Sequence, residues 1–97
     1  VEKGKNFEGM FYGRKKFEND LSSWNVGNGE NFKSMFHYAE KFESDLSAWD
    51  VSKGTDFTNI FINAAILTSN NKSSVEDWDI CNAGNQFDSG IFKKVCD

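Results

Sequence analysis

The stretch FKSMFHYAEKFESDLSAWDV, from Phe32 to Val51, nearly copies FEGMFYGRKKFENDLSSWNV, from Phe7 to Val26. The two copies begin 25 residues apart, and 13 of 25 positions are identical when residues 1–25 are aligned with residues 26–50. Internal repetition at a fixed period of roughly 20–50 residues is typical of folds built from stacked repeats. The repeat therefore governs the prediction of the fold.

The whole chain divides into about three and a half such units within a single domain. Residues 1–25 and 26–50 form the first two, residues 51–79 form a longer third, and residues 80–97 form a shortened C-terminal cap. A unit of this size cannot cover its own apolar face, so stacked neighbours must complete the core. The recurring apolar columns are Phe7, Phe32, Phe57 and Phe87; Met10, Met35, Ile60 and Ile91; Phe11, Phe36, Phe61 and Phe92; and Trp24, Trp49 and Trp78.

Each unit contains two kinds of apolar spacing. Within residues 32–39 the apolar positions follow an i, i+3, i+4, i+7 pattern, which predicts an amphipathic helix. Trp49 and Val51 alternate with polar neighbours, which predicts a short strand. We therefore expect an α/β repeat: a leucine-rich-repeat-like solenoid of helix–strand units with short parallel strands on one face.

The composition limits the possible partners. Ten Phe, three Trp and two Tyr indicate an ordered core made mainly of rings. The net charge of −4 disfavours binding to nucleic acid, and the basic run at residues 14–16 is followed directly by Glu18 and Asp20. Apolar runs stay far below the ~18 residues of a membrane span, so we expect no membrane insertion.

The recurring Met-Phe, Phe and Asp-Leu-Ser-x-Trp-(Asp/Asn)-Val elements resemble a known repeat. This is the roughly 25-residue repeat of BspA-like leucine-rich-repeat surface proteins, also abundant in mycoplasma-type surface lipoproteins and in some algal and protist proteins. The resemblance covers residues 1–67 and, less fully, residues 78–92. It implies adhesion, surface display or protein–protein interaction, and it brings no catalytic residues. Gly29 and Gly54 depart from the pattern because the family usually has Val there, and Phe32 and Phe57 depart from it because the family often has Met.

The only two cysteines are Cys81 and Cys96. A disulfide between them would close a loop of about 15 residues and contribute about 3 kcal/mol in the chain-entropy model. Two reduced, buried thiols are the alternative, and without a CxxC motif or a nearby His a metal site is not indicated. A disulfide suits an oxidising compartment, so we expect an extracytoplasmic location: secreted, on the cell surface or in an organelle lumen.

Short polar residues recur on the outward side of the predicted strands. The strand face of a stacked-repeat protein is often its binding face, which predicts contact with a basic or polar protein surface. Two alternatives are a Ca²⁺ site and a purely structural role, in which these side chains satisfy turn backbones in every unit. Asp20 and Asp45 form a second column, which we interpret as turn formers. The candidate binding-face residues are Asn25, Asp50, Asp77, Asp79, Ser23 and Ser52.

No motif places a nucleophile beside His37, the only histidine, so we expect no enzyme and no cofactor. The predicted function is a non-enzymatic protein-interaction or scaffold module, such as a peripheral subunit of a larger assembly. The alternative is a cell-surface adhesin fragment that binds a host or matrix protein. Because Val1 falls inside a Trp-x-Val element, we expect further residues or a partner chain to cover residues 1–11.

Overall fold

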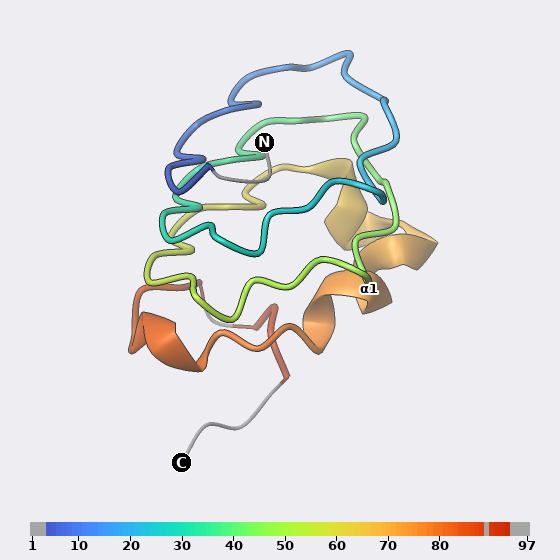
Figure 1. The fold of residues 1–97 in the computed structure, drawn as a ribbon. Coiled ribbons are helices and arrows are strands. Elements are labelled where there is room, and N and C mark those ends of the chain that lie inside the picture. The colour runs from blue at the N-terminus through green and yellow to red at the C-terminus, as the bar shows by residue number, and fades with distance from the viewer. Residues whose placement is uncertain (1–3, 89, 94–97) are drawn as a thin grey trace.

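The computed structural model describes residues 4–88 and 90–93. Within these ranges the chain winds as a stack of coils, from the N-terminal coil at the top of Figure 1 to the C-terminal segment at the bottom. The helical elements of the described residues are all short and follow residue 64. They are the 3₁₀ helices η1 (Ala65–Thr68), η2 (Asn70–Lys72) and η3 (Cys81–Ala83), and the α-helix α1 (Ser73–Glu76).

The predicted α/β class, a leucine-rich-repeat-like solenoid of helix–strand units, is wrong. Among the described residues there is no strand and no sheet, only isolated parallel bridges that join Asn6 to Asn31, Asn31 to Asp56, and Phe57 to Phe87. Residues 32–39 contain no helix, and residues 49–51 contain no strand. Most of each coil is made of turns and irregular chain.

The predicted helix fails because a left-handed residue recurs every fourth position. In the first coil these residues are Gly9 and Gly13, with φ of 63° and 70°. An α-helix needs negative φ throughout, so each left-handed residue ends the helical path. A turn that repeats every four residues still brings apolar side chains to one side, and its spacing therefore resembles a helical one. The equivalent residues are Ser34 (φ 57°), Tyr38 (φ 62°), Asn59 (φ 61°) and Asn63 (φ 58°).

Backbone amides in these turns alternate between two kinds of acceptor. Every second N–H donates to a carbonyl of the next coil, and the amides between them donate to the carbonyl three residues earlier. Phe36 N–H, for example, donates to Ile60 at 2.9 Å, whereas Ala39 N–H donates to Phe36 at 2.9 Å. This ladder satisfies the backbone donors without a sheet. The donor–acceptor pairs from the second coil to the third are Phe32–Asp56, Ser34–Thr58, Phe36–Ile60 and Tyr38–Ile62.

The predicted Trp-x-Val strand lies between two local turns. Trp49 N–H donates to Leu46 at 3.0 Å, and Gly54 N–H donates to Val51 at 2.8 Å. The contact with the preceding coil is made by the Trp side chain, whose Nε1 donates to the Leu21 carbonyl at 2.8 Å. The Trp-x-Val element is therefore fixed by turns and by an indole hydrogen bond instead of strand pairing.

The core consists of aromatic rings stacked one coil apart. The rings of Phe7 and Phe32 are 5.5 Å apart, and those of Phe32 and Phe57 are 5.2 Å apart, each pair within 8° of parallel. Phe36 stacks in the same way between Phe11 and Phe61, at 5.4 and 5.7 Å. Offset stacks of this kind add about 0.5–1.5 kcal/mol per pair beyond area burial. The aromatic columns thus form one continuous core along the stack.

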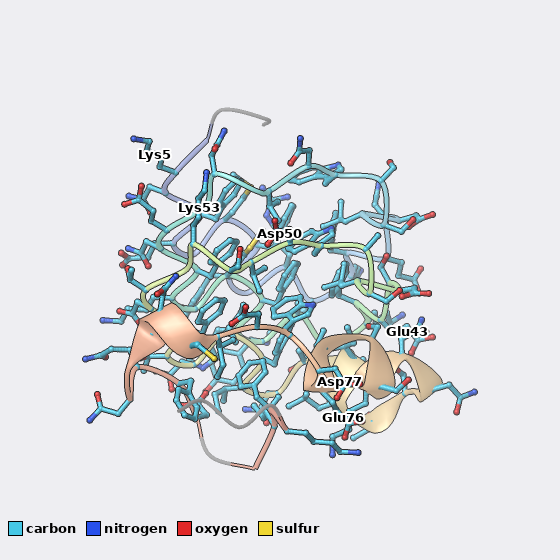
Figure 2. The ribbon with its side chains drawn as sticks, turned by 60° about the horizontal axis from the view of Figure 1, so that its bottom comes forward. Lys5, Glu43, Asp50, Lys53, Glu76 and Asp77 are labelled. Atoms are coloured by element: carbon cyan, nitrogen blue, oxygen red, sulfur yellow. The ribbon has the colours of Figure 1, made fainter. Side chains whose placement is uncertain are left out.

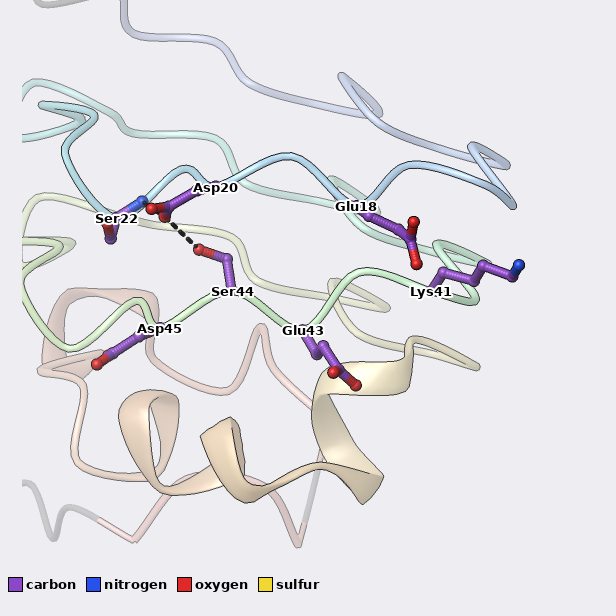
Figure 3. A pocket seen from close by; sticks show the side chains of 7 residues that line it. All are labelled: Glu18, Asp20, Ser22, Lys41, Glu43, Ser44 and Asp45. Carbon is purple, nitrogen blue, oxygen red and sulfur yellow. Dashed lines mark hydrogen bonds between the residues drawn. The ribbon is translucent and has the colours of Figure 1, made fainter.

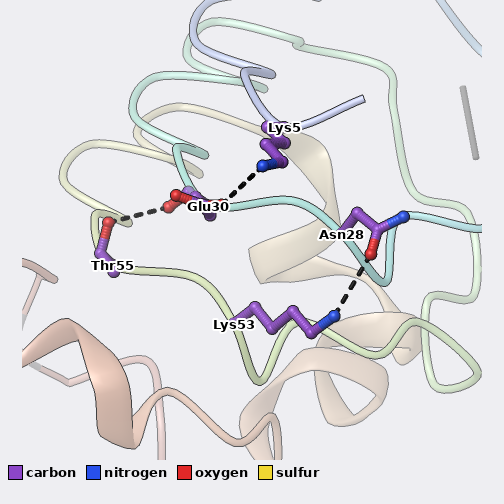
Figure 4. Close-up of polar contacts among 5 residues, drawn as sticks. All are labelled: Lys5, Asn28, Glu30, Lys53 and Thr55. Atoms are coloured by element: carbon purple, nitrogen blue, oxygen red, sulfur yellow. Dashed lines mark hydrogen bonds and ion pairs between the residues drawn. The ribbon is translucent and has the colours of Figure 1, made fainter. Parts of the chain in front are cut away.

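Polar contacts on the surface also connect successive coils (Figure 4). Thr55 donates to the Glu30 carbonyl through both its N–H, at 2.7 Å, and its hydroxyl, at 3.1 Å. Lys53 Nζ donates to Asn28 Oδ1 at 3.2 Å, and Lys5 pairs with Glu30 at 3.9 Å. Exposed ion pairs such as Lys5–Glu30 contribute little to stability. The surface contacts therefore serve mainly to keep the coils in register.

Two buried glycines explain the departures from the resembled repeat. A Cβ built on Gly29 would lie 2.3 Å from Cζ of Phe32, and one built on Gly54 would lie 2.3 Å from Cζ of Phe57. The Phe ring therefore fills the space that a larger residue at the glycine position would need. The missing side chain at each glycine thus compensates for the size of the neighbouring Phe ring.

We predict that Gly54→Ala lowers the free energy of unfolding by about 1–3 kcal/mol, because overpacking displaces the Phe57 ring. Urea denaturation of the purified protein measures this change. The double variant with Phe57→Met provides the control, since the flexible Met side chain makes room for the new methyl group. The combined loss should be smaller than the sum of the two single losses, and strict additivity would contradict the compensation.

Candidate functional site

The predicted binding column is built from turn-closing side chains. Asn25 Oδ1 accepts the Gly27 N–H at 3.0 Å, and Asp50 Oδ1 accepts the Ser52 N–H at 3.0 Å. Asp79 Oδ1 accepts the Cys81 N–H at 3.1 Å. The structural role that the sequence left open is therefore present in each coil. These bonds hold the side chains in fixed orientations at the surface, and the binding role stays a prediction.

The remaining candidates do not all join this column. The Ser52 hydroxyl donates to Asp50 at 2.7 Å, so these two residues form one unit, while Ser23 is exposed in the first coil. Asp77 is exposed at the C-terminal end of α1, where it caps the helix through its N–H to the Val75 carbonyl. Figure 2 shows Asp77 beside Glu76 and apart from Asp50. The proposed face is thus split between the coil turns and the end of α1.

A second acidic group lines a hollow of about 480 Å³ beside the first and second coils (Figure 3). Asp20 accepts the Ser22 N–H at 2.8 Å, and Asp45 accepts the Ser47 N–H at 2.9 Å, as turn formers do. Ser44 connects the coils, because its hydroxyl donates to Asp20 at 3.0 Å and accepts the Leu21 N–H at 3.1 Å. The lining residues are Glu18, Asp20, Ser22, Lys41, Glu43, Ser44 and Asp45.

No single motif in the sequence marks this hollow as a site, although the aligned units contain its signal. Glu18 and Glu43 occupy equivalent positions one coil apart, as do Asp20 and Asp45. The hollow therefore has four carboxylates and one ammonium group, from Lys41. Within residues 4–88 and 90–93, no group of three or more His, Cys, Asp or Glu side chains is arranged to hold a metal ion. The Ca²⁺ alternative thus gains no support from the described residues.

Three turn carboxylates are held in their ionised form. The backbone N–H of Ser22 lowers the pKa of Asp20, with smaller contributions from the hydroxyls of Ser22 and Ser44. The N–H of Ser47 is the main cause of the lowered pKa of Asp45. For Asp50 the pKa is lowered first by the hydroxyl of Ser52 and then by its N–H. Each of these groups therefore stays negatively charged to a lower pH than an ordinary Asp side chain.

We predict that these carboxylates make the fold sensitive to acid. A folded pKa below the ordinary value of 3.8 means that the stabilisation is present above that pH and is lost as the pH falls through the folded pKa. Urea denaturation midpoints between about pH 2 and pH 6 should therefore fall less steeply in a triple variant with Asp20→Asn, Asp45→Asn and Asp50→Asn. Asn25 shows that an amide closes the same turn. An unchanged slope would contradict the prediction.

A basic hollow of about 520 Å³ lies in the first coil, lined by Gly13, Arg14, Lys15, Lys16 and Phe17. Its position differs from that of the acidic hollow, which begins at Glu18. The basic run at residues 14–16 therefore borders the ring of Phe17, which is only partly buried.

The two cysteines and the histidine have different surroundings. Cys81 is exposed in η3, and no described cysteine is a free thiol. Cys96 lies outside the described residues, so its pairing with Cys81 stays a prediction.

His37 packs against Tyr12 and Tyr38 at ring-centroid distances of 4.9 and 4.3 Å. Its Nδ1 is buried and has no hydrogen-bond partner among the described residues.

The described part of the chain contains no helix that is long and apolar enough to cross a lipid bilayer. The aligned coils, the aromatic core and the turn carboxylates define the chain as a repeat protein whose repeated polar groups lie at the surface. It belongs to the family described as Mycoplasma protein of unknown function, DUF285, whose model matches residues 1–95. No curated protein and no solved structure matches the chain.

Proposed function

We propose that this chain is a non-enzymatic protein–protein interaction or scaffold module of the BspA-like repeat type. The observation that supports this proposal is the repetition of turn-fixed polar side chains at equivalent positions of successive coils. Asn25 and Asp50 form one such row, and Asp20 and Asp45 form another. Side chains already held by turn bonds lose little conformational freedom on binding, so a partner meets a preorganised surface.

The proposed partner of the Asn25–Asp50–Asp79 column is a protein surface with basic or polar groups. The Asp50 carboxylate is negatively charged at neutral pH, and the hydroxyl and N–H of Ser52 lower its pKa further. Charges at the rim of an interface act mainly on the association rate and on the choice of partner. The column is therefore expected to select a partner through charge and position.

The first experiment is the native mass of the complex that contains this chain after gentle extraction, with identification of the co-migrating chains. We expect migration with a larger assembly, and migration at the monomer mass under all extraction conditions would contradict the scaffold function. The partner found in this way then serves to test the binding column.

The chain itself supplies matched controls for the test of the binding column with the identified partner. Asp50→Asn with Asp79→Asn removes both charges but keeps an acceptor for each turn, as Asn25 does. Asp50→Lys with Asp79→Lys reverses the charges. We expect weaker partner binding for the Asn pair and the largest loss for the Lys pair. Equal binding by both variants and the parent would exclude this column and leave the scaffold function to another surface.

An extracytoplasmic location is part of the proposal, through the predicted disulfide between Cys81 and Cys96. We predict that peptide mapping without reduction recovers the two cysteines in one crosslinked fragment. Reduction should separate the fragment, and Cys96→Ser should abolish it. Alkylation of both cysteines in the unreduced, unfolded chain would show two thiols and contradict the pairing.

A further inference from the structure

Three aromatic side chains form a cluster on the side of the stack, which we call the aromatic corner: Tyr12, His37 and Tyr38. Tyr38 stacks on His37 at a ring-centroid distance of 4.3 Å. The rings of Tyr12 and Tyr38 are 6.1 Å apart and nearly perpendicular, at 87°. Tyr12 is 52% exposed and Tyr38 is 38% exposed, whereas every Phe of the second coil is fully buried. The two Tyr side chains therefore stand outside the core.

Tyr38 lies in the second coil, with another coil on either side. Its N–H donates to the Ile62 carbonyl of the third coil at 2.8 Å, and the Gly13 N–H of the first coil donates to the His37 carbonyl at 2.8 Å. The exposure of Tyr38 is therefore lateral and does not arise at an end of the stack. Its equivalents in the neighbouring coils are Gly13 and Asn63, so neither equivalent position carries a large side chain that could cover its ring.

The backbone at Tyr38 adopts a conformation that tyrosine seldom takes. Tyr38 has a φ of 62°, in the left-handed region. The equivalent residues with this conformation are Gly13 and Asn63, at 70° and 58°, and Gly and Asn tolerate it far better. The neighbouring His37 has a buried Nδ1 without a hydrogen-bond partner among the described residues. Both features cost stability, and residues held at such a cost are typical of binding sites.

The aromatic corner also presents hydrogen-bond donors at the surface. The side chains of Tyr12, Tyr38 and Asn63 are exposed, and none of them makes a hydrogen bond with another described residue. Asn63 belongs to the same surface, because it follows Ile62, whose carbonyl accepts the Tyr38 N–H. Tyr hydroxyls and Asn amides both donate to carbonyl oxygens. A ligand that is rich in carbonyl acceptors and has apolar rings matches this set of groups.

We propose that the aromatic corner binds a proline-rich segment of a partner protein in the polyproline II conformation. Such a segment has no internal hydrogen bonds, so its carbonyls are free to accept, and its prolines have no N–H. Proline-rich segments dock in grooves lined by aromatic side chains. A proline ring packs on the face of Tyr38 opposite His37, and Tyr12 forms the second wall. This inference rests on the proposed protein-binding function and names the chemistry of one partner.

A second copy of these residues is not the occupant, because the sequence contains no proline. A polyproline II segment is already extended before it binds, so it loses little conformational freedom on a small site. Carbohydrates also stack on aromatic rings, but their hydroxyls donate as well as accept. The aromatic corner itself contains no carboxylate to receive those donors, which favours the proline-rich segment.

The test is an NMR titration of the complete 97-residue chain with decaproline. We expect shifts concentrated at the ring signals of Tyr12 and Tyr38, and saturable binding with a Kd of about 1 mM or tighter. A Gly-Ser peptide of the same length is the control, because it has carbonyls but is a flexible coil without rings. Its affinity should be at least about tenfold lower.

Tyr38→Asn separates a binding role from a structural one. Asn63 shows that Asn occupies the same left-handed position in the next coil. We expect the variant to melt at or above the temperature of the parent, while its affinity for decaproline falls at least about tenfold. Tyr12→Phe keeps the ring and removes one donor, so its affinity should fall about two- to tenfold. Parent affinity in Tyr38→Asn would overturn the proposal.

Two further results would also overturn the aromatic corner as a proline-binding site. One is the absence of shifts at about 5 mM decaproline, and the other is equal affinity for the Gly-Ser peptide. Shifts of the same rings with glucose or N-acetylglucosamine, and none with decaproline, would identify a carbohydrate as the ligand and contradict the proposed partner.

The native-mass experiment separates this inference from the broader function. A large assembly together with inactive decaproline would leave the interaction function standing and exclude the aromatic corner. Decaproline binding at the corner without a larger assembly would support the corner and contradict the scaffold function.

Discussion

Phe36→Ala is expected to lower the free energy of unfolding by about 3–5 kcal/mol. The Phe36 side chain is 0% exposed and lies in the middle of the core. Its ring stacks on Phe42 at 4.3 Å within the coil, and it lies 5.4 and 5.7 Å from Phe11 and Phe61 in the coils on either side. Removing it opens a cavity bordered by three coils and interrupts the Phe11–Phe36–Phe61 column. Guanidinium denaturation followed by Trp fluorescence measures the loss.

Phe17→Ala is the matched control, because it removes the same atoms from a partly buried ring of the first coil. Its expected loss is less than half that of Phe36→Ala. A domain of this size has a total stability of about 5–15 kcal/mol, so the Phe36 variant should also unfold at a clearly lower temperature. Equal losses for the two variants would contradict the prediction, because they would show that the loss of stability does not depend on how deeply the ring is buried.

The stacking columns and the secondary structure differ in how well the sequence predicts them. Placing Phe7 with Phe32 and Phe11 with Phe36 required only the 25-residue period, and the structure stacks both pairs. To predict the backbone of residues 32–39 correctly, the 3.6-residue period of an α-helix had to be distinguished from the four-residue period of the turns. Over eight residues the two periods place apolar side chains almost alike, so the spacing did not decide between helix and turns.

The signal that distinguishes turns from a helix appears when equivalent positions of the three units are compared. Ser34 and Tyr38 give no indication of a left-handed backbone, because such residues seldom adopt it. Their equivalents are Gly9 and Gly13 in the first unit and Asn59 and Asn63 in the third. Gly and Asn are the residues most tolerant of positive φ, so the three units together carry the signal that one unit hides.

In the candidate site, too, the local turns were predictable from the sequence and the contacts between coils were not. Turn formation by Asp20 and Asp45 followed from short polar residues in a turn-rich stretch, and the structure contains both turns. The acidic hollow depends on Ser44 reaching the preceding coil, a contact between residues 24 positions apart that no local pattern indicates.

Trp49→Ala is expected to cost about 3–5 kcal/mol of unfolding free energy, again as the loss of a buried aromatic ring. Trp49 is 4% exposed, and its ring is 6.0 Å from that of Phe36 and 6.0 Å from that of Trp78, the latter pair within 7° of parallel. Its Nε1 donates to the Leu21 carbonyl of the preceding coil at 2.8 Å. The side chain therefore connects three coils through one ring. Thermal and urea denaturation followed by circular dichroism measure the loss without relying on the Trp signal.

Trp49→Phe separates the ring from the indole hydrogen bond. Phe keeps most of the apolar contact but has no donor, and a single hydrogen bond contributes about 0.5–1.5 kcal/mol net. The Leu21 carbonyl still accepts the Trp24 N–H at 3.0 Å, so it is not left without a donor. We therefore expect Trp49→Phe to lose less than half of what Trp49→Ala loses. If the two losses were equal, the indole bond and not the ring would fix the coil, and the aromatic column would not be the main source of stability at this position.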